Sequence, residues 1–453
     1  MSLGSACLVI SFACYFQWAF LCRWIAELES QLCRRFDNGV LMSEFERAKR
    51  GFSAEEAYDL QRQYRANNIA VAGEQALYMY LNMPQFFPHQ VVARGGAVMD
   101  LPLAADIDIE GSIGAVSACT ALGELTLDQL LNDPRSRVQG FIVLHRGRIV
   151  FERYPGMRPE DNHLWWSSAK VLAGTLAAML VCDGVLDPTR PVEYFLPEFA
   201  ASGWQGTSVQ DVADHCSGIN AEELEISSYA SPQSELSRLI MAERILEPED
   251  GREMLTHNEA LLSMTRKRPA GEVFEYSSAN TNMLGLIIEK VTGRRYADVL
   301  SERIWSRIGA EQNGMMGLAP QGNAIAHGMF SSSLRDLARL GLAFTPTGQR
   351  QRPVISKEVL RMIQNGGRPN LYPLSAKRPT LTEWFGESPE ACSWQWDAVF
   401  RDGDMFKAGF HGQALYVSPT RDVVAAFFST SDERAQFHYL RPIAQSSAFD
   451  ITA

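Results

Sequence analysis

Hydrophobic and polar positions along the chain predict one buried helix and two strand hairpins. Apolar side chains occupy nearly every position of residues 167–182, which predicts a helix buried on all sides. Gly184 follows and suits a C-terminal cap. Residues 140–154 read as two strands around an Arg146-Gly147 turn, and residues 406–430 alternate as strands around a turn at 419–422. Both hairpins are therefore expected to belong to a sheet.

The order of these segments predicts the fold class. Residues 203–315 are mostly helical, with two helices separated at Thr292-Gly293, and a last helical stretch runs from about 431 to 447. An early hairpin, helices in the middle and a late hairpin with a helix predict one antiparallel sheet built from both ends of the chain. The expected class is α+β, with a sheet flanked by helices and a mostly helical lobe.

The first 85 residues are predicted to form a helical extension that precedes a domain at 86–453. Residues 23–85 mix charged and apolar positions at helical spacing, and Ser53 to Glu56 has the form of a capping box. Residues 86–125 are irregular and punctuated by proline and glycine, which places the boundary near residue 85.

Residues 1–22 carry no charge and are just long enough to span a membrane. Glycine, serine and glutamine dilute this segment, and it lacks a basic start. A membrane anchor at residues 3–22 and a buried or partner-facing helix are therefore equal alternatives. A cytoplasmic location is favoured, and a homodimer is left open.

Composition narrows the classes of function. The net charge of −11, without a run of lysine or arginine, argues against a nucleic-acid partner. Four of the eight cysteines lie in the first 33 residues and no Cys-x-x-Cys pair occurs, so neither a disulfide framework nor a zinc site is indicated. No metal or other cofactor is expected.

The buried helix begins with the one Ser-x-x-Lys of the chain, formed by Ser167 and Lys170. Lysine is scarce here, seven residues against thirty-five arginines, so this lysine is informative. Residues three apart on a helix share a face, and a neutral lysine can accept the proton that activates a serine hydroxyl. Burial beneath Trp165 and Trp166 would lower the pKa of Lys170 toward neutrality. The alternative is a helix-capping serine beside a lysine whose ammonium reaches solvent.

Two further stretches favour the catalytic interpretation. GEVFEYSSANTNMLGLIIEK places Tyr276 in a serine-rich turn before a helix, and FKAGFHGQALYVSP places Lys407 on a strand. In this order, Ser-x-x-Lys, Tyr-Ser-x and Lys-x-Gly resemble the penicillin-recognising serine hydrolases. These include class C β-lactamases, DD-peptidases, related esterases and 6-aminohexanoate-dimer hydrolases. FIVLHRGRIVFERY, SVQDVADHCSGI and HGQALYVSP resemble the last group most, and the resemblance covers about residues 86–445. It implies a β-lactamase/transpeptidase-like fold.

The resemblance also implies a role for each motif residue. Ser167 would be the acyl-forming nucleophile, Lys170 its base, and Tyr276 the group that relays a proton to the leaving group. The backbone N–H groups of Ser167 and Phe410 would form the oxyanion hole. The residues expected to contact the substrate are Trp166, Tyr229, Lys407, Gly409 and His411.

Some of these positions have alternatives. His411 is more typical of a residue that supports its turn than of a base, and Lys407 either binds a substrate carboxylate or is a solvated lysine on an edge strand. Tyr229 lies in a loop that varies among the relatives. Ser278 stands where β-lactamases carry an asparagine that helps to hold the lactam amide, so efficient penicillin hydrolysis is not expected.

The sequence thus predicts a serine hydrolase that cleaves a small linear amide or ester through an acyl-enzyme. The first alternative is a cell-wall DD-peptidase or weak β-lactamase on the same scaffold. The second is a non-hydrolytic binding or sensor protein that has kept the fold. Turnover of p-nitrophenyl acetate or butyrate would separate an enzyme from a binding protein.

Overall fold

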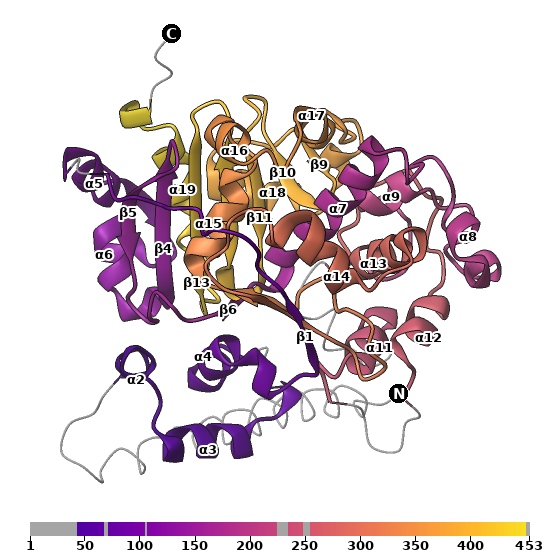
Figure 1. The fold of residues 1–453 in the computed structure, drawn as a ribbon, viewed down its shortest axis with the longest axis horizontal. Helices are drawn as coiled ribbons and strands as arrows, with labels where there is room; N and C mark the ends of the chain where they lie inside the picture. The colour runs from indigo at the N-terminus through magenta and orange to yellow at the C-terminus, as the bar shows by residue number, and fades with distance from the viewer. Residues whose placement is uncertain (1–42, 68–70, 105–106, 224–233, 248–253, 450–453) are drawn as a thin grey trace, which may run out of the picture.

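The computed structural model describes residues 43–67, 71–104, 107–223, 234–247 and 254–449. Its centre is a seven-stranded antiparallel sheet with the order β5-β4-β13-β12-β11-β10-β9 (Figure 1). β4 pairs with β13 along its length, so the early hairpin joins the late strands. This confirms the predicted sheet built from both ends of the chain. Its strands are β4 (Val138–His145), β5 (Arg148–Arg153), β9 (Ala391–Ser393), β10 (Trp396–Val399), β11 (Met405–Ala408), β12 (Ala414–Ser418) and β13 (Val423–Ser429).

The strand β4 is buried on both faces, which explains its continuous hydrophobic sequence. Ile142 and Leu144 belong to the larger core, which also contains α7 (Lys170–Cys182) and α15 (Leu334–Leu342). Phe141 and Val143 belong to a second core that contains α19 (Phe437–Ala444). Since successive side chains of a strand alternate between faces, each face of the sheet receives its own layer of helices.

Both predicted turns are present. Arg146 and Gly147, between β4 and β5, have φ values of 50° and 74°, which suit a tight hairpin turn. Residues 419–422 join β12 to β13, and Asp422 also has a positive φ, of 54°. The last helix is shorter than the predicted stretch at 431–447, because regular α-helix is confined to α19.

The helix α7 is buried along almost its whole length, as its apolar sequence predicts. A 3-10 turn, Trp166–Ala169, precedes it, so the α-helix begins at Lys170 rather than at Ser167. Gly174 allows the helix to pass the loop between β9 and β10, since a Cβ there would lie 1.9 Å from the Trp394 carbonyl oxygen. A side chain at this position would displace the helix that carries Lys170.

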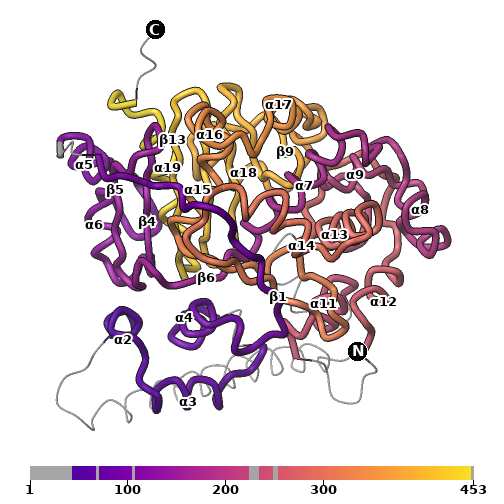
Figure 2. The backbone as a smooth tube through the Cα atoms, in the orientation of Figure 1, coloured from indigo at the N-terminus to yellow at the C-terminus, as the bar shows by residue number. Residues whose placement is uncertain are grey.

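A mostly helical half lies beside the sheet, as predicted (Figure 2). The predicted break at Thr292-Gly293 is present, because Gly293 has a φ of 66° and ends α13. A second sheet, β1-β7-β8-β6, lies between this half and the N-terminal helices. The helices of this half are α8 (Val192–Phe195), α9 (Val209–Ala213), α11 (Glu235–Ala242), α12 (His257–Leu262), α13 (Ser278–Thr292) and α14 (Tyr296–Leu300). The strands are β1 (His89–Val92), β6 (His163–Leu164), β7 (Gly314–Gly317) and β8 (Phe330–Ser332).

Residues 86–125, predicted to be irregular, contain regular elements. Besides β1 they form α5 (Ile107–Gly114) and a small hairpin of β2 (Ser117–Thr120) and β3 (Gly123–Thr126). These strands are four residues long and largely exposed, so they carry little hydrophobic pattern. The remaining helices are α6 (Leu127–Asn132), α16 (Pro346–Gln351), α17 (Lys357–Asn365) and α18 (Arg378–Phe385).

The N-terminal extension contributes three helices to the described structure, α2 (Glu44–Arg50), α3 (Ala54–Gln63) and α4 (Glu74–Leu81), with the predicted capping box at Ser53. Met79 and Tyr80 of α4 are fully buried in the larger core, although they precede the predicted boundary at residue 85. The boundary stays a prediction. Residues 3–22, the candidate anchor, lie outside the described residues, and none of the helices within the described ranges is long and apolar enough to span a membrane.

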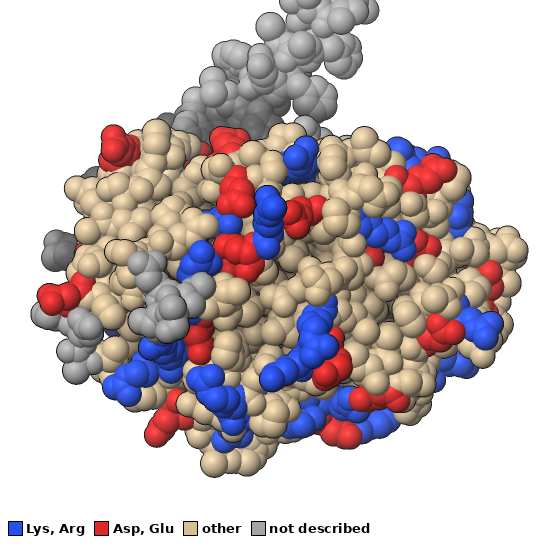
Figure 3. All heavy atoms as spheres, turned by 90° about the horizontal axis from the view of Figure 1, so that it is seen from above, with Lys and Arg blue, Asp and Glu red and all other residues tan. Residues whose placement is uncertain are grey.

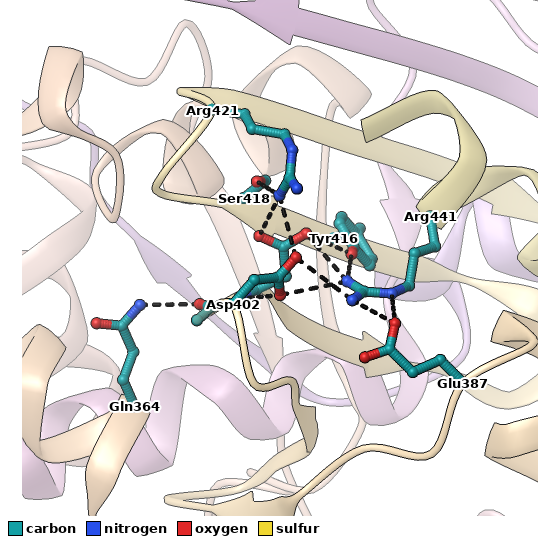
Figure 4. A network of polar contacts seen from close by, with 9 residues as sticks. Gln364, Glu387, Asp402, Tyr416, Ser418, Arg421 and Arg441 are labelled. Carbon is teal, nitrogen blue, oxygen red and sulfur yellow. Dashed lines mark hydrogen bonds and ion pairs between the residues drawn. The ribbon is translucent and has the colours of Figure 1, made fainter. Parts of the chain in front are cut away.

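A buried polar network fastens α19 to the sheet beside the β10–β11 turn (Figure 4). Nη1 of Arg441 donates to Asp404 at 3.2 Å and to the Tyr416 hydroxyl at 2.9 Å. Arg421 reaches the same aspartate at 3.6 Å. Burial raises the pKa of Asp404 to about 6. Because Asp404 immediately precedes β11, the network holds the strand that carries Lys407.

The surface carries both signs of charge. On the face in Figure 3, basic side chains lie among acidic ones. Two of the ion pairs on the molecule join Arg158 to Asp161 at 2.6 Å and Arg335 to Glu152 at 2.7 Å. The visible face therefore lacks the basic stripe that is typical of nucleic-acid-binding proteins.

Candidate active site

The Ser-x-x-Lys pair forms the predicted contact. The Lys170 Nζ lies 2.9 Å from the Ser167 Oγ, although the serine occupies the 3-10 turn and the lysine the first position of α7. Trp166, just before the serine, has a φ of 47°, a left-handed conformation that costs a non-glycine residue energy. Such strain is often found where the surrounding structure presents a functional side chain.

The other two partners of Lys170 are also neutral. Its Nζ donates to the Ser278 Oγ at 3.0 Å and to the backbone carbonyl of His327 at 3.0 Å. The carbonyl is held in turn, because the His327 side chain contacts the buried carboxylate of Glu243 at 2.8 Å. Lys170 is thus fixed by two hydroxyls and a carbonyl, and none of its hydrogen bonds within the described residues goes to a carboxylate.

This environment makes Lys170 a competent base. Burial, helped by the positive charge of Lys407 and opposed by the negative charge of Glu223, lowers the pKa of Lys170 from the usual value to about 7. At pH 7 about half of the lysine is then neutral, whereas an unperturbed lysine is neutral in roughly one molecule in a few thousand. The alternative of a lysine whose ammonium reaches solvent does not fit, since the Lys170 side chain is completely buried.

Tyr276 lies two residues before α13, next to its N-cap Ser277, and contacts a second buried lysine. Lys407 donates to the Tyr276 hydroxyl at 3.0 Å and forms an ion pair with Asp397. The other oxygen of Asp397 accepts the Ala408 backbone N–H at 3.0 Å. β11 lies between β12 and β10, and Lys407 is fully buried, so the alternative of a solvated lysine on an edge strand is wrong.

The two candidate oxyanion donors lie on elements that touch. A Cβ on Gly409 would lie 2.4 Å from the Trp165 carbonyl oxygen, so only glycine lets β11 approach the turn that carries Ser167 this closely. Within the described residues, neither the Ser167 N–H nor the Phe410 N–H donates to a protein acceptor. Two unpaired amides beside a nucleophile are what an oxyanion hole requires.

His411 is held on both sides of its ring. Its Nδ1 lies 2.6 Å from the Tyr80 hydroxyl, and its Nε2 lies 3.1 Å from Asp432. The Tyr80 ring also meets the edge of Trp166, with centroids 5.7 Å apart. His411 itself has a φ of 55° directly after Phe410. These contacts support the turn-holding alternative for His411.

Comparison with known proteins agrees with this geometry. The family model described as Beta-lactamase matches residues 126–448. The chain belongs to the beta-lactamase family. The 6-aminohexanoate-dimer hydrolase of Paenarthrobacter ureafaciens is 31% identical to it over 292 residues, which cover 64% of this chain and 72% of that relative. This beta-lactamase family member is accordingly a hydrolase of the serine β-lactamase superfamily, as predicted.

Solved structures confirm the predicted fold. A Bacillus anthracis protein whose name assigns it to the 6-aminohexanoate-dimer hydrolases superimposes with a TM-score of 0.70 and 23% identity, covering 84% of this chain and 97% of that one. EstCE1, a hydrolase with promiscuous acyltransferase activity, gives 0.54 at 13% identity, covering 75% and 98%. A family VIII carboxylesterase gives 0.53 at 14% identity, covering 76% and 98%.

Three site residues of this beta-lactamase family member were not singled out from its sequence. They are the counter-ion Asp397, the half-buried Lys377 at the start of α18, and Glu223, which accepts the Ser278 backbone N–H. Ser278 itself was noted in the sequence, but its hydrogen bond with Lys170 was not predicted. The scarcity of lysine was the one signal for Lys377. Tyr229 lies outside the described residues. No cluster of three or more potential metal ligands occurs within the described ranges.

Proposed function

We propose that this protein cleaves small linear amides or esters through an acyl-enzyme formed on Ser167. The observation that carries the proposal is the 2.9 Å contact between the Ser167 hydroxyl and Lys170, a buried lysine whose hydrogen-bond partners are all neutral. The expected partner is a small-molecule amide or ester substrate.

The first half of the reaction follows from these contacts. Neutral Lys170 accepts the hydroxyl proton as the Ser167 Oγ bonds to the substrate carbonyl carbon. The negative charge that develops on the carbonyl oxygen is stabilised by the N–H groups of Ser167 and Phe410, and each such donor is typically worth about 3–4 kcal/mol in the transition state. The lysine is then an ammonium that holds the proton needed by the leaving group.

Tyr276 is placed to deliver that proton. Its hydroxyl accepts a hydrogen bond from Lys407, and the positive charge there favours release of the phenolic proton. The leaving amine or alcohol takes the proton from Tyr276, which recovers one from Lys170, and the acyl-enzyme remains. Water then attacks the acyl carbon and loses a proton through Tyr276 to Lys170. As the bond between the acyl carbon and the Ser167 Oγ breaks and the acid is released, the Ser167 Oγ takes this proton back from Lys170, which leaves the serine hydroxyl and the neutral lysine restored.

A linear substrate is favoured over a lactam. The residue that stands in place of the asparagine of β-lactamases, Ser278, uses its hydroxyl to bind Lys170. A serine also lacks the amide group with which an asparagine holds a substrate amide. The DD-peptidase and β-lactamase alternatives are therefore not favoured, and the Paenarthrobacter ureafaciens relative is named as a hydrolase of the 6-aminohexanoate dimer.

Labelling with a fluorophosphonate followed by peptide mass spectrometry tests the nucleophile without knowledge of the substrate. We expect one phosphonylated site, Ser167, and loss of both labelling and p-nitrophenyl butyrate hydrolysis in Ser167→Ala. Ser168→Ala is the matched control, since the neighbouring Ser168 is buried and should leave labelling intact. Labelling at Ser168 or Ser277 would contradict the proposal, and absence of both labelling and hydrolysis would favour the binding-protein alternative.

A further inference from the structure

A third lysine lies at Tyr276 and has no part in the steps described so far. The Lys377 Nζ lies 3.1 Å from the centroid of the Tyr276 ring. The Nζ of Lys407 and that of Lys170 lie 4.5 and 5.0 Å from the same centroid. Three of the seven lysines in the chain therefore surround one aromatic ring.

The three ammonium groups differ in their partners. Lys407 is neutralised by Asp397, and Lys170 is bound by two hydroxyls and a carbonyl. For the Lys377 ammonium, no hydrogen-bond acceptor and no ion-pair partner occurs within the described residues, and its direct contact is the face of the Tyr276 ring. As a whole residue Lys377 is half-buried, whereas the other two lysines are completely buried.

Within the described residues, the Lys377 ammonium has no carboxylate in direct contact, although the negative charges of Asp397 and Glu223 act on it from a distance. Removing a charged group from water is unfavourable unless a counter-ion or hydrogen bonds replace the lost hydration. Burial accordingly lowers the pKa of Lys377 to about 8; Asp397 opposes this effect and Lys407 adds to it. Since Asp397 already pairs with Lys407, an additional carboxylate would satisfy the remaining positive charge.

We propose that Lys377 binds a carboxylate carried by the leaving-group half of the substrate, and that it, rather than Lys407, is the residue that selects for this charge. The proposal rests on the proposed function, in which Tyr276 protonates the leaving group. The ammonium on its ring therefore lies on the leaving-group side of the scissile bond. It is at most about 8 Å from the Lys170 Nζ, the sum of the two distances to the ring. A carboxylate makes strong charge-assisted hydrogen bonds with such a group.

Two matched esters test this subsite. 4-(Butanoyloxy)benzoate carries a carboxylate on its leaving phenol, and its methyl ester lacks that charge. The intrinsic reactivities of the two esters differ, but this difference cancels when the ratio of their rates is compared between protein variants. We expect the ratio of their kcat/KM values to fall at least about tenfold in Lys377→Met, mainly through KM, the size expected for a hydrogen bond to a charged group. Lys377→Arg should keep the ratio within about threefold. Arg378→Met removes a neighbouring positive charge and should leave the ratio unchanged.

The pH dependence gives a readout that a purely structural role would not move. The Lys377 ammonium is charged below its pKa of about 8, so the preference for the carboxylate should be present below pH 8 and be lost as the pH rises through it. In Lys377→Arg, the preference should persist above pH 8, because arginine remains protonated.

Binding to Ser167→Ala separates the two proposals, since this variant lacks the nucleophile but keeps Lys377. Calorimetry should show tighter binding of the carboxylate ester than of the methyl ester, and the added Lys377→Met should abolish the difference. If this difference in binding is found but the native protein hydrolyses neither ester, the carboxylate subsite at Lys377 is supported and the proposed hydrolase function is refuted. Hydrolysis with a ratio unaffected by Lys377→Met would overturn the subsite and leave the hydrolase standing.

Discussion

Lys170 and Lys407 are both completely buried beside Tyr276, yet their surroundings differ in one respect. Lys170 is held by neutral acceptors, and its pKa falls to about 7. Lys407 is held by the carboxylate of Asp397. A buried lysine without a counter-ion readily gives up its proton, whereas one paired with a carboxylate keeps it. The two buried lysines therefore differ in their partners: Lys170, the proposed base, contacts neutral groups, whereas Lys407 contacts a carboxylate.

The elements that carry the lysines explain the two sets of partners. The register that pairs Ala398 with Phe406 places Asp397 opposite Lys407 on adjacent antiparallel strands, where side chains meet on one face. Lys170 begins a helix, and its partners come from the preceding turn, from α13 and from the segment before β8. Sheet register thus supplies the carboxylate to one lysine, and helix packing keeps carboxylates from hydrogen bonding to the other.

Replacing the base should have the largest effect. Lys170→Arg keeps a cation that cannot be neutral at usable pH, so kcat on p-nitrophenyl butyrate should fall by about 10³-fold, within the usual range for a general base. Lys357→Arg, on exposed α17, is the matched control and should retain native activity. Activity of Lys170→Arg within tenfold of the native protein would show that another group accepts the proton.

Removing Asp397, the counter-ion of Lys407, should have the next largest effect and should lower the stability of the fold. Asp397→Asn leaves Lys407 buried without its carboxylate, so the free energy of unfolding should fall by about 3 kcal/mol, the lower end for a broken buried pair. Urea unfolding monitored by circular dichroism measures this, with Asp187→Asn as an exposed control. A loss no larger than that of the control would mean that Lys407 does not depend on Asp397.

Tyr276→Phe should separate amides from esters. An amine must be protonated as it departs, whereas a nitrophenolate leaves without help, so amide turnover should fall about 10²-fold more than p-nitrophenyl ester turnover. Rates on a linear N-acyl amide and on p-nitrophenyl butyrate give this ratio. Equal losses on the two substrates would instead place the hydroxyl in activation of Ser167 or in support of the fold.

The smallest effect concerns the pH profile. In the proposed mechanism neutral Lys170 is the active form, and burial lowers its pKa to about 7, so ester kcat/KM should rise as the pH increases through 7 and level off above it. Ser278→Ala removes an acceptor that stabilises the ammonium form, so the midpoint should move to lower pH by up to about one unit. A midpoint that stays in place or moves upward would show that Ser278 does not stabilise the charged lysine.

Local features of the site could be predicted because they depend on neighbouring residues. The spacing of Ser167 and Lys170 places them on one face of a turn or helix wherever the helix packs. The strand pattern around Lys407 and the serine-rich turn at Tyr276 are local as well. The ordered set of motifs then identified the family, and the continuous apolar sequence of 167–182 identified a buried helix.

The contacts of Tyr80 show where sequence reasoning stopped. It reaches His411 across more than three hundred positions, from a helix that precedes the predicted boundary. No local sequence pattern around Tyr80 or His411 indicates that the two residues are in contact. The same holds for Lys377, which meets Tyr276 only because α18 packs beside the start of α13.

The sequence by itself determined the general form of the sheet and which serine and lysine are the candidate nucleophile and base, since periodicity, spacing and turn chemistry act over a few residues. Only the tertiary structure decided that Lys170 has neutral partners while Lys407 has a carboxylate, and that Lys377 has neither. A pKa depends on solvent exclusion and on charges a few ångströms away in space. The distances from Lys170 to Ser278 and to the His327 carbonyl exist only after segments more than a hundred residues apart have packed together, and the distance from Lys407 to Asp397 exists only after two neighbouring strands have paired in register.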